Sequence, residues 1–161
     1  MLMIKEISVE EEISQSVQVI RESFATVARD FNLTETNSPT NPAFTSIEKV
    51  LAMKEKDIKL FGLFIDNRQV GFVAVEKAGE SLFYMERLAV LPEFRHAGLG
   101  KELMDFVFQF LKKERDAKVS IGIINENIIL KKWYQDYGFV ETALKSYPHL
   151  PFTVCLMERP V

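Results

Sequence analysis

A run of small and basic residues between an apolar strand and an amphipathic helix constrains this chain more than any other feature. The run reads Arg95-His96-Ala97-Gly98-Leu99-Gly100 and follows an expected strand over residues 82–90. Beyond it, apolar residues recur at helical spacing at Leu103, Phe106, Val107, Phe110 and Leu111. A helix that begins inside the run leaves N–H groups of its first turn without partners and places the positive end of its dipole there. The sequence therefore predicts an anion site, with Arg95 as its charged wall.

Two better-known glycine loops do not fit these residues. A Walker loop requires glycine where Arg95 stands, and Ser or Thr where Glu102 follows Lys101. A dinucleotide fingerprint requires a third glycine where Leu103 stands, and an acidic residue about twenty positions on, where the chain reads Val119-Ser120-Ile121. The sequence therefore excludes both the nucleoside triphosphatase and the dinucleotide-binding interpretations.

Composition indicates one globular domain over residues 1–161. Apolar residues make up 47% and charged residues 27% of the chain, and the single cysteine, Cys155, excludes an internal disulfide and the usual zinc ligand set. The net charge of −3 gives no basic face for nucleic acid. Neither a signal peptide nor an apolar spanning segment is recognisable, so we expect a cytoplasmic protein without a membrane partner or a metal.

Periodicity along the chain predicts an alternation of strands and helices. The expected helices are 10–31, 45 or 46 to about 56, one beginning at Leu99, and 128–137. The expected strands are 4–8, 58–65, 69–75, 82–90, 119–124, about 140–144 and 152–157. The fold class is therefore α/β (α+β), a mixed sheet with helices on both faces.

Three motifs in order resemble the GCN5-related N-acetyltransferase (GNAT) superfamily. They are Arg-x-x-Gly-x-Gly at 95–100, Asn127 after the strand at 119–124, and Tyr134 followed by Gly138-Phe139. The resemblance covers about residues 60–142, whereas the first 57 residues match only in the order of their elements. It implies the GNAT fold, a mostly antiparallel sheet of six to seven strands, and acetyl-CoA-dependent N-acetylation of a primary amine in a ternary complex.

The resemblance also implies which residues bind acetyl-CoA. The pyrophosphate would lie among Arg95, His96, Ala97, Gly98, Leu99, Gly100 and Lys101. Asn127 would bond the pantetheine or the neighbouring phosphates. The backbone of Leu88, Ala89 and Val90 would supply the N–H donor for the thioester carbonyl, where the central strand separates from the next one.

Acyl transfer from a thioester to an amine also needs a base for the amine and an acid for the leaving thiolate. Alternation along 82–90 places Tyr84, Glu86, Leu88 and Val90 on one face, which in the family carries the catalytic carboxylate. Glu86 is therefore the candidate base, and partial burial would raise its pKa toward working pH. The alternative for Glu86 is a pairing with an arginine.

Tyr134 is the candidate acid, because it matches the family's tyrosine that protonates the CoA sulfur. A phenol with an ordinary pKa near 10 is protonated at neutral pH and can donate to a thiolate. Tyr137 lacks the Gly-Phe pair that follows Tyr134. The alternative for Tyr134 is an aromatic packing side chain.

The acceptor is where the sequence says least. In the family, the first two helices with their loop, and the last hairpin, form the acceptor side. Candidate acceptor contacts are Phe44, Tyr84 and His149, each of which an ordinary loop, strand or turn also explains. A non-catalytic CoA-binding module, an interaction domain with an accidental glycine loop, another acyl group and O-acetylation all remain open. A homodimer is possible by resemblance.

Overall fold

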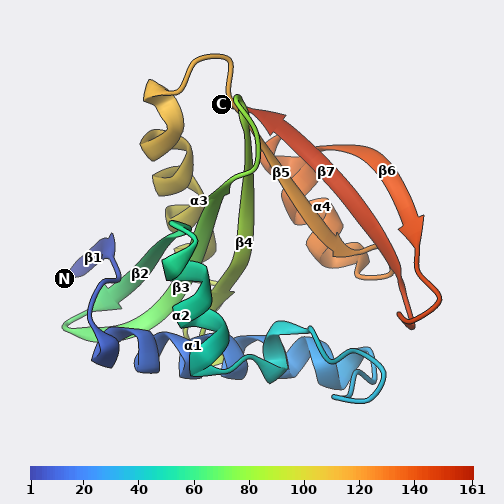
Figure 1. The fold of residues 1–161 in the computed structure, drawn as a ribbon, viewed down its shortest axis with the longest axis horizontal. Coiled ribbons are helices and arrows are strands. Elements are labelled where there is room, and N and C mark those ends of the chain that lie inside the picture. The colour runs from blue at the N-terminus through green and yellow to red at the C-terminus, as the bar shows by residue number, and fades with distance from the viewer.

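The computed structural model describes all residues from 1 to 161, and its centre is one seven-stranded sheet (Figure 1). The strands are β1 (Leu2–Glu6), β2 (Lys59–Ile65), β3 (Arg68–Lys77), β4 (Leu82–Val90), β5 (Lys118–Ile124), β6 (Val140–Ser146) and β7 (Thr153–Pro160). Their order in the sheet is β1-β2-β3-β4-β5-β7-β6, and β4 with β5 is the single parallel pair. This mixed, mostly antiparallel sheet confirms the predicted fold class.

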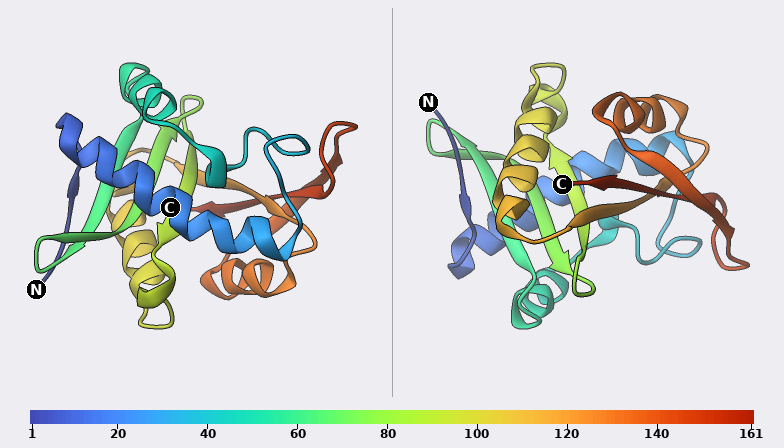
Figure 2. Two further views of the ribbon diagram at one scale, coloured as in Figure 1. Left: turned by 90° about the horizontal axis from the view of Figure 1, so that it is seen from below. Right: turned by 90° about the horizontal axis from the view of Figure 1, so that it is seen from above.

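Helices cover both faces of the sheet. They are α1 (Glu10–Asp30), α2 (Ile47–Glu55), α3 (Leu99–Phe110) and α4 (Ile128–Tyr137), with short 3-10 turns η1 (Pro42–Phe44), η2 (Pro92–Phe94) and η3 (Leu111–Lys113). The two views of Figure 2 show α1 in front of the sheet from one side, and α3 with α4 in front from the other. None of these helices is both long enough and apolar enough to cross a bilayer.

Most predicted elements are confirmed, and the differences lie at element ends. The strand at 82–90 and the helix at 128–137 have the predicted bounds, and Ser46 caps α2 by accepting a bond from the Lys49 N–H. The first strand spans 2–6 and not 4–8, because Ile7 turns into the core before α1 begins. The last two strands run a few residues beyond their predicted ends, since β6 pairs with β7 as far as Ser146 and the end of β7 pairs with β5 as far as Pro160.

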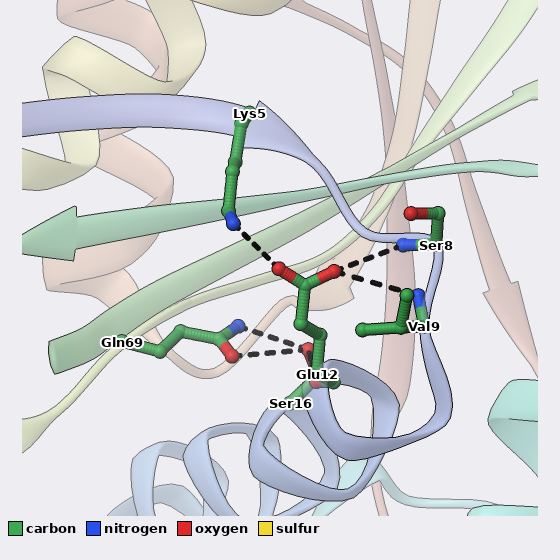
Figure 3. A network of polar contacts seen from close by, with 6 residues as sticks. All are labelled: Lys5, Ser8, Val9, Glu12, Ser16 and Gln69. Atoms are coloured by element: carbon green, nitrogen blue, oxygen red, sulfur yellow. Dashed lines mark hydrogen bonds and ion pairs between the residues drawn. The ribbon is translucent and has the colours of Figure 1, made fainter. Parts of the chain in front are cut away.

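A polar network fixes the start of α1 on the sheet (Figure 3). The Glu12 carboxylate accepts bonds from the Ser8 and Val9 N–H groups and lies 2.6 Å from the Lys5 Nζ of β1. Gln69 of β3 donates its side-chain amide to the Ser16 hydroxyl at 2.9 Å, and both side chains are buried. These contacts link β1, α1 and β3, and so set where the far end of α1 meets the loop after β4.

The central strands separate at the place where the predicted site lies. β4 pairs with β5 only over Leu82–Tyr84 against Lys118–Ser120, and Figure 1 shows β5 running away from β4 beyond that point. On its other side β4 stays paired with β3 as far as Val90. The second half of β4 therefore has one edge that is not covered by β5.

Candidate active site

The loop before α3 presents an uninterrupted series of free backbone donors. No hydrogen bond of the structure takes the N–H groups of residues 96 to 101, and the first bond of α3 runs from the Glu102 N–H to the Gly98 carbonyl. No side chain caps the helix at Gly98. Because these donors lie at the positive end of the helix dipole, an anion with several oxygens can accept bonds from several of them at once.

The two positions in the loop require glycine for different structural reasons. Gly98 has φ of +78°, and a Cβ there would meet nothing within 4 Å, so the chain is open to a ligand at this point. Gly100 faces α4, because its Cβ would lie 3.2 Å from the indole ring of Trp133. Gly98 therefore keeps the cradle accessible, whereas Gly100 allows α3 and α4 to approach each other.

Arg95 does not form the charged wall that the sequence predicts. Its guanidinium donates to the Ser23 carbonyl at 2.6 Å, to the Thr26 hydroxyl at 2.9 Å and to the Val90 carbonyl at 3.3 Å. Partial burial, with the charge of Arg29 nearby, lowers its pKa. The side chain points back to α1, so Arg95 joins the loop to α1 in this structure, and the free N–H groups of the loop are backbone groups.

A bulge in β4 corrects the predicted assignment of faces. Ala74 of β3 pairs with Glu86 and Phe72 pairs with Ala89, so Arg87 and Leu88 together oppose one residue of β3. Arg87 adopts φ of +54°, a left-handed conformation that is uncommon for residues other than glycine.

Beyond the bulge the alternation along β4 is reversed. Ala89 now shares a face with Glu86, whereas Val90 pairs with Gly71, whose Cβ position lies 3.1 Å from Leu103 of α3. The prediction that Val90 lies on the face of Glu86 is therefore wrong. The Val90 N–H is also occupied, since it donates to the Ser23 hydroxyl at 3.3 Å. The Leu91 N–H donates to the Val70 carbonyl of β3, and alternate residues of an antiparallel strand point their N–H groups to the same edge, so the Ala89 N–H also points to β3. Of the three predicted backbone donors, Leu88 remains.

Glu86 is a half-buried carboxyl with an unusual environment. Its pKa is raised to about 7, first by burial and then by a side-chain hydrogen bond with Glu76 and by the charge of Glu76, whereas Arg87 acts in the opposite direction. The Arg87 guanidinium lies 3.6 Å from the Glu86 carboxylate. The direction of the predicted pKa shift of Glu86 is confirmed. The alternative prediction, an arginine neighbour, is also met, but Arg87 affects the pKa of Glu86 less than burial and Glu76 do.

Glu76 is the residue that reading the sequence missed. It pairs with Tyr84 across β3 and β4, which places its side chain on the face of Glu86. The signal was available, because the turn between the two strands and the alternation of β3 together place Glu76 near Glu86.

Tyr134 is buried in an aromatic cluster on α4. Its side chain is 6% exposed, and its ring packs against Trp133 at 5.0 Å and Phe139 at 5.4 Å between centroids. Its hydroxyl takes part in no hydrogen bond of the structure, and burial raises its pKa well above the ordinary value. Tyr137 differs, since its hydroxyl donates to Asp105 at 2.5 Å. Tyr134 therefore carries a proton that no neighbouring group accepts.

Asn127 and Gly138 mark the two ends of α4. The Asn127 side-chain oxygen accepts a bond from the Leu130 N–H at 3.2 Å, so this side chain caps the helix. Gly138 ends the helix with φ of +110°, and a Cβ there would lie 2.8 Å from Arg159. The sequence spacing from Asn127 through Tyr134 to Gly138 therefore corresponds to one helix, α4, and its two caps.

The three predicted acceptor residues do not lie together. Phe44 of the α1–α2 connection and Phe152, just before β7, both pack against a small apolar cluster that contains Ile124. His149 is exposed in the β6–β7 turn, with its ring 5.6 Å from that of Tyr147. Tyr84 is exposed on β4 beside Glu76 and Glu86. The structure therefore groups Tyr84 with the carboxyls, but not with Phe44 or His149.

Glu86 and Tyr134 lie on opposite sides of the sheet. Glu86 pairs with Ala74 and so faces the side of α1, whereas Tyr134 belongs to α4, which packs beside α3 on the other side. The two side chains can act on one molecule only where β4 and β5 separate. Groups approaching from the two sides of the sheet would meet at that opening.

Comparisons with known proteins agree with this geometry. A family model described as an acetyltransferase (GNAT) domain matches residues 32–149. The ribosomal-protein-S18-alanine N-acetyltransferase of Escherichia coli is similar in structure, with a TM-score of 0.78 at 15% identity over 99% of this chain and 94% of that one.

Two archaeal structures are similar to the same extent. The PaiA N-acetyltransferase of Thermoplasma acidophilum, solved in complex with coenzyme A, gives a TM-score of 0.76 at 18% identity over 100% of this chain and 99% of that one. Ard1 of Thermoplasma volcanium gives a TM-score of 0.76 at 21% identity over 99% of this chain and 97% of that one. These likenesses show the fold, and the family model covers most of the sequence. The chain therefore belongs to the GNAT acetyltransferase family, whose general reaction is acyl transfer.

Proposed function

We propose that this protein transfers an acetyl group from acetyl-CoA to a primary amine, by direct attack within a ternary complex. The observation that carries the proposal is the series of free N–H groups at residues 96 to 101, which ends beside the opening between β4 and β5. That series suits a pyrophosphate, and the opening suits an extended chain that leads from it to the carboxyl face.

The residues present fit coenzyme A. Several N–H donors and open space at Gly98 can take the pyrophosphate, and the unpaired edge of β4 can take an amide-containing arm by backbone hydrogen bonds. When bound, acetyl-CoA supplies the thioester acetyl group. The complex of the Thermoplasma acidophilum neighbour with coenzyme A supports this assignment.

Glu86 would act as the base for the amine. An amine in its ammonium form must lose a proton before it can attack, and a carboxylate with a pKa of about 7 is a stronger base than an ordinary one. A carboxylate with this pKa is also ionised to a large extent at neutral pH. Tyr84, exposed beside Glu86, would contact the acceptor on the same face.

Tyr134 would act as the acid for the leaving thiolate. Its hydroxyl is protonated at neutral pH, has no acceptor within the protein and lies on the side of the sheet opposite Glu86. A thiolate that arrives there would therefore be its first hydrogen-bond partner. The backbone N–H of Leu88, at the bulge, is the remaining candidate for the oxyanion donor.

Thiol release from acetyl-CoA, measured with a panel of primary amines, tests the proposal. The expected result is amine-dependent release that falls by about 10²-fold or more in Glu86→Gln and in Tyr134→Phe, while both variants still bind CoA. Tyr137→Phe is the matched control, because its hydroxyl bonds Asp105 and has no part in the reaction. CoA binding without release for any amine would instead support a non-catalytic CoA-binding module.

A further inference from the structure

Glu86 is not an isolated carboxyl, because β3 brings a second one to it. In the β3–β4 register Ala74 pairs with Glu86 and Glu76 pairs with Tyr84, so Glu76 and Glu86 are diagonal neighbours on one face. Glu76 raises the pKa of Glu86 through a side-chain hydrogen bond and through its charge. Glu76 is half-buried, and so is Glu86.

Two carboxylates that interact in this way cannot both be ionised at low cost. Carboxylate oxygens only accept hydrogen bonds, so a bond between the two groups exists only when one of them carries a proton. Partial burial strengthens the repulsion between two negative charges, and one shared proton removes it. The geometry therefore favours a carboxyl pair with one proton over two independent carboxylates.

The charged groups around the pair are few. Glu76 from β3 and Arg87 from β4 act on Glu86, and α1, which packs on this face, contributes no charged group that does so. Arg87 lies 3.6 Å from Glu86 and its Nε is buried without a partner, so it compensates one negative charge and not two. After burial, Glu76 is therefore the neighbouring group with the largest effect on how readily Glu86 loses its proton.

We propose that Glu76 is a positioning residue for acetyl transfer, which shares one proton with Glu86 and holds that carboxyl on the face that receives the amine. The catalytic role of Glu76 rests on the proposed function, but the carboxyl pair itself is present in the protein without ligands. The proton taken from the amine would enter the pair when both carboxyls are ionised, would then be the one proton that they share, and would leave to solvent before the next turnover. Glu76 touches neither reactant.

Direct titration of the carboxyls tests the pair without any reaction. The ¹³C chemical shift of the Glu86 carboxyl is followed against pH in the wild type and in Glu76→Gln. The variant removes the second charge, and its amide can donate to ionised Glu86, so the midpoint of Glu86 should fall by about one pH unit. It should stay above 4.5, because burial is the largest cause of the rise. An unchanged midpoint would overturn the inference.

A matched control and a kinetic readout complete the test. Glu80→Gln removes a carboxyl from the exposed β3–β4 turn and should leave the Glu86 midpoint unchanged. With an accepted amine, the acid limb of kcat/KM should move to lower pH in Glu76→Gln, which raises activity up to about tenfold below both midpoints while the plateau is kept. If the plateau of kcat/KM falls in Glu76→Gln but its acid limb stays at the same pH, the role of Glu76 is structural and the inference is wrong.

The two proposals can fail separately. If no amine supports thiol release but the Glu86 midpoint falls in Glu76→Gln, the pair stands and the proposed function fails. If release is observed and the midpoint does not move, the proposed function stands and the role of Glu76 is refuted.

Discussion

Arg95 gives the sharpest test of how the loop before α3 is built, because sequence and structure assign it different roles. Its guanidinium holds the Ser23 carbonyl and the Thr26 hydroxyl of α1 and the Val90 carbonyl at the end of β4. Arg95→Leu keeps most of the apolar stem and removes every donor. If the side chain joins the loop to α1, the variant loses stability and not ligand affinity.

The magnitude follows from the bonds that are lost. The two shortest are 2.6 and 2.9 Å long, and a bond from a charged donor contributes about 1.5 kcal/mol at the low end of its range, which suits a half-exposed side chain. The free energy of unfolding should therefore fall by about 3 kcal/mol. For a chain of this size the midpoint of thermal unfolding should fall by about 6 to 12 °C.

Urea unfolding followed by circular dichroism measures this loss, and calorimetry with CoA measures affinity at a temperature where the variant is folded. We expect CoA affinity within about threefold of the wild type. Arg68→Leu is the matched control, since Arg68 makes an exposed ion pair with Glu93 and should change stability by less than about 0.5 kcal/mol. Unchanged stability of Arg95→Leu with lost CoA binding would refute the reasoning and restore Arg95 as a ligand residue.

Three further predictions concern single side chains. Gly98→Ala should cost about 1 kcal/mol of stability, because φ is +78°, and should weaken CoA binding in calorimetry by placing a methyl group in the open cradle. Tyr134→Phe should unfold close to the wild-type urea midpoint, because the hydroxyl that it removes makes no hydrogen bond to the protein; a clear loss of stability would reveal a hidden bond. Glu12→Gln should lower the thermal midpoint at pH 7, and the difference should shrink as pH falls from 4.5 through the lower pKa of the folded state. The Lys5 contact lowers the folded pKa of Glu12, so its stabilisation exists above the unfolded pKa and is lost on protonation; a difference that does not shrink with falling pH would contradict this.

Local patterns in the sequence were sufficient for the elements that carry the site. The helix at 128–137 has the predicted bounds because its signals are local: Asn127 caps its start and Gly138 ends it with a positive φ. The glycine loop was predictable for the same reason, because it depends only on Gly98, Gly100 and the helix that begins at Leu99. Such features depend on neighbours along the chain, so spacing predicts them.

Features that depend on distant partners were not predictable in the same way. The bulge at Arg87 and Leu88 arises in the pairing with β3, so alternation along β4 alone placed Val90 on the wrong face. The partners of Arg95 come from α1, about 70 residues earlier in the sequence, and nothing near Arg95 indicates them. An arginine in a glycine loop is therefore not by itself evidence of a bound anion.

Glu76 lies between these two cases. Its face follows from the alternation of β3, but its importance appears only when the register of the two strands is known. The effect of a neighbouring carboxyl on the pKa of Glu86 can be predicted only when the residues that share its face are known. The direction of the Glu86 pKa shift was thus predictable from burial, whereas the contribution of Glu76 was not.

Amide chemical shifts on addition of coenzyme A test the central claim most directly. In ¹H–¹⁵N spectra of the full chain, the amides of residues 96 to 101 should move together on titration with CoA and should not move with ATP at the same concentration. The amide of Leu88 should follow when acetyl-CoA replaces CoA. Saturable shifts that leave residues 96 to 101 unchanged, or no shifts at all, would contradict the assignment of this loop as the cradle of an acetyl-CoA-dependent transferase.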